Sequence, residues 1–291
     1  MTEAVRHLKE YQTRLQFEGD VVSNERLTSV DAEAEIRELV LDIDRKDFPF
    51  RLGQSVGVIV PGSPEFGQSH HFRMYSVADL PTTGSTGRPR IKIAVRRCFY
   101  IDDYSGEAYP GIASNYLCDR QPGDKVIMTG PFGAVFDVPE EDEANLILIG
   151  TGTGIAPFRA FVKHIYENKP DWQGRIRLFY GARSGLELLY MNDEKDDFAQ
   201  YYDKETFKAF QVLSPRPHWT EQVAWEQTLG ERGAELLEMF DDPSTYVFIA
   251  GLVKMRPELD KVFALIMGSE EKWGRRKAEL VAGKRWVELL Y

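Results

Sequence analysis

An apolar run that ends in a glycine-rich turn constrains the fold more than any other feature of this chain. Leu146–Ile149 is apolar throughout, as in a parallel strand that is buried on both faces. Gly150, Gly152 and Gly154 follow at once, and from Ile155 onward the apolar residues recur with helical spacing. Glycines at a strand-to-helix turn let the backbone approach a pyrophosphate, whose charge is met by N–H groups at the helix start. The pattern indicates a nucleotide-binding unit, although a tight turn without a ligand stays open because the dinucleotide fingerprint would require another glycine at Ile155.

The second half of the chain alternates strand and helix signals. Apolar runs typical of buried strands recur at residues 177–180, 210–213 and 245–250. Helices are expected through about 186–202, in a long region that ends near Phe240, and through 260–267. This order predicts a parallel, doubly wound α/β domain of the Rossmann-like kind.

The first half is filled by short runs in which polar and apolar residues alternate, as they do in half-buried strands. These runs cover residues 19–22, 35–41, 55–60 and 91–96, with a further run at 125–128. Pro61-Gly62 and the stretch 121–124 are turn signals. Many short strands separated by turns predict an antiparallel β-barrel or sandwich, and we expect the barrel. Residues 1–18 read as a charged arm or a short helix.

The pattern changes at the acidic stretch 139–143, from short alternating strands before it to alternating strands and helices after it. We expect this stretch to be a linker. A length of 291 residues also suits two domains of roughly 150 residues each. We therefore expect a β-barrel domain with an N-terminal arm at residues 1–142 and an α/β domain at residues 143–291.

Composition excludes several classes of function. The formal net charge of −10 argues against general nucleic-acid binding. Two cysteines are too few for an iron–sulfur cluster or an ordinary structural zinc site, each of which takes about four protein ligands, so no metal is expected. No stretch stays apolar for the roughly 18 residues of a membrane helix, and the N-terminus lacks the apolar core of a signal peptide, so the cytoplasm is the expected compartment.

Three further stretches contain residues suited to binding a flavin nucleotide. Arg73-Met74-Tyr75-Ser76 ends an expected strand, where an arginine can hold a pyrophosphate, a tyrosine can cover a flat ring and a serine can reach its edge, although an ordinary strand remains open. Gly111–Asp119 reads as a helix start, with Ser114 as a candidate cap and phosphate donor. The terminal Trp286–Tyr291 ends in an aromatic residue that could close a core or stack on a ring.

The order and spacing of these signals resemble those of plant-type ferredoxin–NADP⁺ reductases from about Val21 to Tyr291. The stretches that carry the resemblance are Leu52–Gly57, Arg73–Ser76, Val95–Tyr100, Gly111–Asp124, Gly150–Arg159, Gly251–Met255 and Tyr291. The resemblance implies an FAD-binding barrel, an NADP-binding α/β domain, and electron transfer between NADP(H) and a separate one-electron carrier such as ferredoxin or flavodoxin.

The resemblance also assigns roles to individual residues. FAD would be held by Arg73, Met74, Tyr75, Ser76, Arg96, Tyr100, Gly111, Ile112, Ala113 and Ser114. The second nucleotide would be held by Gly152, Thr153, Arg183, Ser214, Arg216, Gly251, Leu252 and Met255. Tyr291 would stack on the flavin face that the nicotinamide must enter, opposite Tyr75. Ser76, Glu288 and Tyr291 are the candidate catalytic residues.

Departures from the family pattern leave alternatives open. Ala250 stands where the family has a cysteine, and Glu288 lies one position earlier than the family's glutamate, with Leu289 in its place. Glu288 could still serve if the last strand carries a one-residue bulge. Val223 and Trp225 are the best matches to the lysine and tyrosine of the 2′-phosphate pocket, and the absence of a strand-end acid there favours NADP(H), without excluding NADH. Alternatives are a flavin-binding subunit that senses or assembles without turnover, and an NAD(P)H oxidase or free-flavin reductase.

An acidic carrier would need a positive docking face despite the net charge. Two basic clusters are candidates: Arg88, Arg90, Lys92, Arg96 and Arg97, and near the end of the chain Arg275, Arg276, Lys277, Lys284 and Arg285. Ordinary solvated charge is the alternative for both.

Overall fold

The computed structural model describes residues 13, 15–62, 69–101, 106–133, 137–193, 195–215 and 223–291. Contacts between Cα atoms divide the chain into two compact units, Met1–Ala134 and Val135–Tyr291. Arg216, a predicted nucleotide contact, lies outside the described residues, as does most of the predicted N-terminal arm. No helix among the described residues combines the length and the apolar character that crossing a membrane requires.

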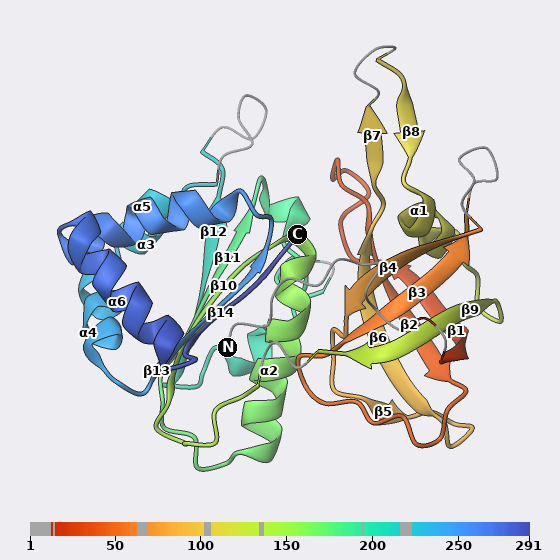
Figure 1. Ribbon diagram of the computed structural model, residues 1–291, viewed down its shortest axis with the longest axis horizontal. Helices are drawn as coiled ribbons and strands as arrows, with labels where there is room; N and C mark the ends of the chain where they lie inside the picture. The colour runs from red at the N-terminus through yellow and green to blue at the C-terminus, as the bar shows by residue number, and fades with distance from the viewer. Residues whose placement is uncertain are drawn as a thin grey trace. The chain divides into compact units, whose positions relative to one another are not determined.

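The first unit is built on a seven-stranded antiparallel sheet with the strand order β4-β3-β9-β1-β2-β6-β5 (Figure 1). Its strands are β1 (Gln16–Arg26), β2 (Ile36–Ile43), β3 (Ser55–Pro61), β4 (His70–Ser76), β5 (Thr82–Thr83), β6 (Pro89–Arg96) and β9 (Lys125–Phe132). A bridge between Val77, just after β4, and Ile93 of β6 shows that the sheet curls back on itself. The prediction of a barrel-like antiparallel domain is confirmed.

Alternation along the strands creates the core of this unit. Side chains such as Leu39, Leu41 and Val58 point inward and are fully buried. The short helix α1 (Ile112–Cys118) adds Ala113 and Leu117 to the same core. A separate two-stranded ladder, β7 (Phe99–Ile101) with β8 (Ala108–Pro110), leads from β6 to α1.

The second unit contains a parallel five-stranded sheet in the order β12-β11-β10-β13-β14. Its strands are β10 (Asn145–Thr151), β11 (Ile176–Ala182), β12 (Phe207–Leu213), β13 (Thr245–Gly251) and β14 (Trp286–Leu290). The central β10 is the first strand in sequence, and the chain runs outward from it first to β11 and β12 and then, on the other side, to β13 and β14. This reversal between β10 and β13 is the topological switch point at which open α/β sheets bind ligands.

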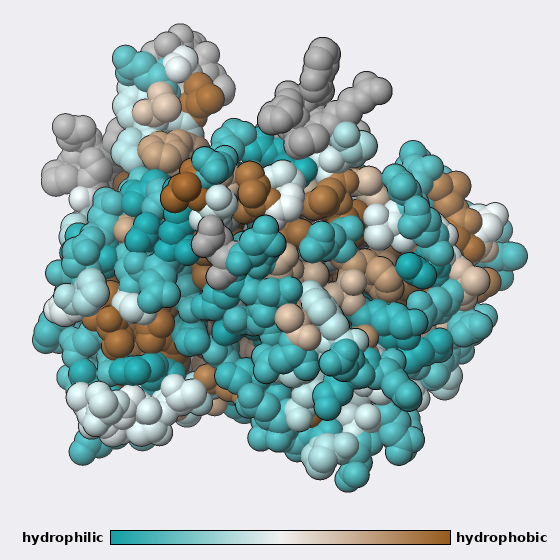
Figure 2. Space-filling view, turned by 180° about the vertical axis from the view of Figure 1, so that it is seen from behind, coloured by the Kyte–Doolittle hydropathy of each residue, from teal (hydrophilic) through white to brown (hydrophobic). Residues whose placement is uncertain are grey.

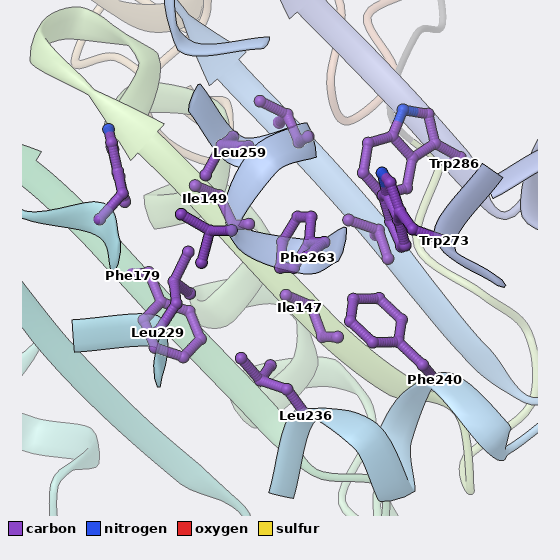
Figure 3. Packing of buried hydrophobic residues seen from close by; sticks show 14 of the residues in the cluster. Ile147, Ile149, Phe179, Leu229, Leu236, Phe240, Leu259, Phe263, Trp273 and Trp286 are labelled. Atoms are coloured by element: carbon purple, nitrogen blue, oxygen red, sulfur yellow. The ribbon is translucent and has the colours of Figure 1, made fainter. Parts of the chain in front are cut away.

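Helices cover both faces of this sheet, as Figure 1 shows. Helix α2 (Ile155–Asn168) lies on one face, and α3 (Trp225–Gly230), α4 (Gly233–Asp241), α5 (Met255–Met267) and α6 (Glu270–Ala282) lie on the other. The larger core, drawn in Figure 3, packs Ile147 and Ile149 of β10 against Leu236, Phe263 and Trp273 of these helices. The doubly wound α/β domain predicted from sequence is confirmed.

Two helix predictions differ from the structure, and one helix was not predicted. Residues 186–202 do not form an α-helix: the segment holds only the short 3₁₀ turns Gly185–Glu187 and Ala199–Tyr201. Leu188, Leu189 and Tyr190 are buried consecutively rather than at helical spacing, and Tyr190 has a φ of 59°. The region that ends near Phe240 is two helices, α3 and α4, and α6 was not predicted.

The acidic stretch expected to be a linker is attached to the second unit. Lys169 Nζ, at the end of α2, donates to the carbonyl oxygens of Pro139 and Glu140 at 2.9 and 2.8 Å and pairs with Asp142. These contacts bind the acidic stretch to α2. The two compact units divide between Ala134 and Val135, earlier in the chain than the boundary expected at residue 142.

Candidate active site

Glycines allow the turn after β10 to approach the end of β13 closely at the switch point. A Cβ on Gly154 would lie 2.2 Å from the carbonyl oxygen of Ala250, far inside contact distance. Gly251 has a φ of 141°, and a Cβ there would meet the Thr151 hydroxyl at 2.3 Å. Gly152, in the 3₁₀ turn η3 (Gly152–Gly154), has a φ of 54° and open space around it. The predicted nucleotide residues Gly152, Thr153 and Gly251 therefore lie at one edge of the sheet.

The C-terminal tyrosine is anchored to this edge. Its hydroxyl lies 2.7 Å from the hydroxyl of Thr153. Its N–H donates to the carbonyl of Gly251, and its own carbonyl accepts from the N–H of Val253. The side chain is nevertheless 58% exposed. Tyr291 is therefore held at its backbone and hydroxyl beside the predicted nucleotide loop while the residue stays exposed to solvent.

Two side chains that the sequence did not single out, Tyr180 and Thr151, form hydrogen bonds at the glycine-rich turn. The hydroxyl of Tyr180 donates to the carbonyl of Gly152 at 2.9 Å and accepts from the N–H of Leu189. Burial raises the pKa of Tyr180 far above its ordinary value, so it remains a donor at neutral pH. The Thr151 hydroxyl donates to the sulfur of Met255 at 3.0 Å, which buries that predicted contact under the loop.

The last strand carries no bulge, contrary to the condition under which Glu288 could replace the family's glutamate. β13 and β14 pair in unbroken register, with Ile249 opposite Glu288 and Ala250 opposite Leu289. Side chains alternate along a strand, so Glu288 shares the face of the buried Trp286 and not that of Leu289. Its carboxylate accepts from Arg256 and from the indole N–H of Trp286, both at 2.7 Å. The condition of a one-residue bulge, under which Glu288 could take the glutamate position, is therefore not met.

The predicted 2′-phosphate side is only partly described. Ser214 follows β12 and is buried, and Arg183 forms an ion pair with Glu187 at 2.9 Å. Trp225 is buried in the core, where its ring lies under Gly181, so it cannot stand in for an exposed tyrosine. Leu252 is half-buried beside the same core. The match of Trp225 to the tyrosine of this pocket is wrong, because the start of α3 packs inward.

In the first unit, the predicted flavin residues of β4 lie next to β6 and α1, which both contact this strand. Arg73 is exposed, and its guanidinium donates to the carbonyl of Phe72. Burial raises the pKa of the Tyr75 phenol, and the thiols of Cys98 and Cys118 contribute in the same direction. The Ser76 hydroxyl lies 3.4 Å from that of Ser55 on β3.

Helix α1 begins at Gly111 without a side-chain cap. Ser114 is therefore not the cap that the sequence suggested. Its hydroxyl accepts from the N–H of Cys98 at 3.2 Å and donates to the carbonyl of Gly111 at 3.3 Å. Ser114 thus joins the end of β6 to the start of α1 and holds Ile112 and Ala113 beside that end.

The ladder of β7 and β8 exposes aromatic rings. Tyr100 is 53% exposed and stacks on Tyr109, with ring centroids 5.3 Å apart. Phe99 and Ile101, on the same ladder, are exposed as well. On the face of the molecule drawn in Figure 2, hydrophilic residues cover most of the surface, and apolar patches lie between them. Tyr109 was missed from the sequence, because only its cross-strand pairing with Tyr100 reveals its place.

Most members of the two basic clusters are already paired with carboxylates. The pairs are Arg88 with Asp20, Arg90 with Asp42, Lys92 with Asp79, Arg97 with Glu35, Arg275 with Glu271, Arg276 with Asp241, and Lys277 with Asp260. On β6 this follows from register, since Arg90 lies opposite Asp42 of β2. Arg96 and Lys284 are exposed. These ion pairs partly neutralise the two clusters, and their role as docking faces stays a prediction.

Comparison with known proteins agrees with both units. Residues 148–261 match the family model of the oxidoreductase NAD-binding domain. A chloroplastic ferredoxin–NADP reductase of Mesembryanthemum crystallinum is 31% identical over 98% of this chain and 78% of its own length. The leaf isozyme 1 of Oryza sativa subsp. indica is 32% identical over 97% of this chain and 78% of its own length.

Solved structures have the same fold over the whole chain. The ferredoxin-NADP⁺ reductase from Plasmodium falciparum, solved with 2'P-AMP, superposes with a TM-score of 0.71 at 20% identity, and the match covers 97% of this chain and 98% of that one. Together with the identity to the plant enzymes, this establishes that the chain belongs to the ferredoxin–NADP reductase family.

Proposed function

We propose that this protein is an FAD-dependent reductase that transfers electrons between NADP(H) and a separate one-electron carrier, of which ferredoxin is the first candidate. The observation that carries the proposal is the meeting of Gly152, Thr153, Gly251 and Tyr291 at the switch point of the sheet. Relatives that span nearly the whole chain bear the name of this activity.

The residues of the first unit fit an FAD. Arg73, in the middle of β4, and Arg96, at the end of β6, are exposed cations suited to a pyrophosphate. The exposed Tyr100, stacked on Tyr109, offers a flat aromatic surface suited to an adenine ring. Tyr75 and Ser76 would lie against the flavin itself, with Gly111, Ile112 and Ala113 supplying backbone contacts. Bound FAD would exchange a hydride with the nicotinamide and single electrons with the carrier.

The second unit would bind NADP(H). Gly152 and Thr153 would contact the pyrophosphate and nicotinamide, and Gly251 and Leu252 would form the wall along the adenosine part, with the buried Met255 behind them. Ser214, Arg183 and Arg216 are proposed for the 2′-phosphate end. The exposed ring of Tyr291 would cover the flavin until the nicotinamide takes its place, so its firm anchoring and exposed face both suit that role.

The acceptor is proposed to be an external protein. Of the two cysteines, Cys118 is buried and only Cys98 is exposed, so the chain has too few thiols to ligate an iron–sulfur cluster of its own. We further propose that the protein works in the cytoplasm.

Steady-state turnover tests this proposal. The FAD-loaded protein should reduce ferricyanide with NADPH and should pass electrons to an added ferredoxin. A protein that binds FAD but reduces neither acceptor would be the flavin-binding subunit without turnover. Fast oxygen consumption that no carrier protein accelerates would indicate an oxidase instead.

A further inference from the structure

The carboxylate of Glu288 has its own set of partners on the sheet face that α5 and α6 cover. One oxygen accepts from Arg256 Nε at 2.7 Å, and the other accepts from the indole N–H of Trp286 at 2.7 Å. Lys277 Nζ lies 4.0 Å from the second oxygen. The Glu288 side chain is only 15% exposed, so these contacts are partly shielded from solvent. Glu288 therefore contacts α5 and α6 and does not lie on the same face of β14 as Leu289.

These contacts involve β14, which has only one neighbouring strand. β14 is the edge strand of its sheet and pairs with β13 alone. A slip of one residue along a strand exchanges its two faces, and a single ladder resists such a slip less than two ladders do. Trp286 fixes the start of β14, because its ring packs on that of Trp273 with the ring centroids 5.4 Å apart. Figure 3 shows the two rings beside each other. Glu288 is the next residue on the same face.

Arg256 connects this strand to the predicted nucleotide loop. It lies in the first turn of α5, directly after the segment in which Gly251 and Val253 hold the backbone of Tyr291. The Arg256–Glu288 pair therefore joins the middle of β14 to the same loop that holds its end.

We propose that Arg256 and Glu288 are positioning residues that hold β14 in register and thereby fix where the terminal Tyr291 lies. The importance of that position rests on the proposed function, in which Tyr291 covers the flavin. With the pair broken, β14 would fray from its free end, and Tyr291 would lose its place beside Thr153.

Release of the terminal residue by carboxypeptidase A measures this fraying directly. The FAD-loaded chain of 291 residues is used, and loss of Tyr291 is followed by mass spectrometry. E288Q keeps an acceptor for Trp286 but removes the charge, and R256Q removes the cation. Each should accelerate release about 5-fold, as expected for loss of a partly shielded ion pair near a chain end. The double variant should be no faster than either single one, and R256K should restore slow release. R275Q, which breaks the exposed Arg275–Glu271 pair on α6, is the matched control and should not change the rate.

The same variants separate positioning from general stability. Their melting temperatures should stay close to the wild-type value, because Arg256 is half-exposed. Wild-type release rates in E288Q and R256Q would overturn the proposal, and so would release that only follows a loss of global stability. If release accelerates while flavin reduction by NADPH is unchanged, the positioning role stands and the role of Tyr291 at the flavin fails.

Discussion

The hydroxyl of the C-terminal Tyr291 lies 2.7 Å from that of Thr153, so the last residue of the chain is tied to the turn that follows the first strand of its sheet. The proposed function requires the nicotinamide to displace this ring. Within that proposal, the hydrogen bond between the hydroxyls of Thr153 and Tyr291 would have to break as the nucleotide enters.

Substitution of Thr153 by valine should ease that displacement. A neutral hydrogen bond contributes about 1 kcal/mol net, so T153V should lower the KM for NADPH by roughly 3- to 5-fold with a smaller effect on kcat. T153S keeps the hydroxyl and should behave as wild type. A KM that rises in T153V would assign the hydroxyl to the nucleotide and contradict this interpretation.

Gly154 should not tolerate a side chain. A Cβ would lie 2.2 Å from the backbone oxygen of Ala250, which cannot move without separating β10 from β13. G154A should therefore destabilise the second unit by about 3 kcal/mol, as overpacking of a rigid core does, with a lower urea midpoint. G274A is the control, since this exposed glycine of α6 has open space, and it should stabilise by about 0.5 kcal/mol. Equal midpoints for the two variants would refute the close approach.

Acid should weaken the first unit partly through Glu35. Burial alone would raise the pKa of this carboxyl, but hydrogen bonds from Arg97 and Arg37 outweigh it and bring the pKa below its ordinary 4.5. A lowered pKa in the folded state gives stability that is fully present above pH 4.5 and is lost as the pH falls through the folded value. E35Q should therefore cost about 1 kcal/mol at pH 7 and progressively less in acid, as measured by denaturant unfolding. D47N, which removes an exposed partner of Arg45, should show no such trend.

The two thiols should differ in reactivity. Cys98 is exposed, whereas Cys118 is buried and burial raises its pKa to about 12. Because the thiolate is the reactive form, one thiol should titrate with a disulfide reagent at pH 8 in the native protein, and both in denaturant. C98S should abolish the native reaction. Two thiols that react equally in the native state would contradict the burial of Cys118.

The sequence predicted those parts of the molecule that have strong local signals. The run at Leu146–Ile149 and the glycines after it identified the first strand and its turn, because burial on both faces and close backbone approach each restrict the residue types. The segment 186–202 was wrongly predicted as a helix because it contains as many apolar residues as a helix would. They are buried through a turn at Tyr190 instead, which composition does not reveal.

The parts of the site that depend on register or on distant packing could not be read from the sequence. The direction of Glu288 depends on unbroken pairing with β13, and a one-residue difference decides which face it occupies. The burial of Trp225 depends on the path of the chain into α3. The partners of the basic clusters lie on other strands and helices, so the pairing of Arg90 with Asp42 appears only once β2 and β6 are side by side.

The visible absorbance of the bound flavin tests the central claim most directly. The protein is loaded with FAD, kept free of oxygen and mixed with NADPH. The account predicts that the flavin absorbance bleaches and that an added oxidised ferredoxin restores it. A protein that holds FAD but is bleached by neither NADPH nor NADH would contradict it.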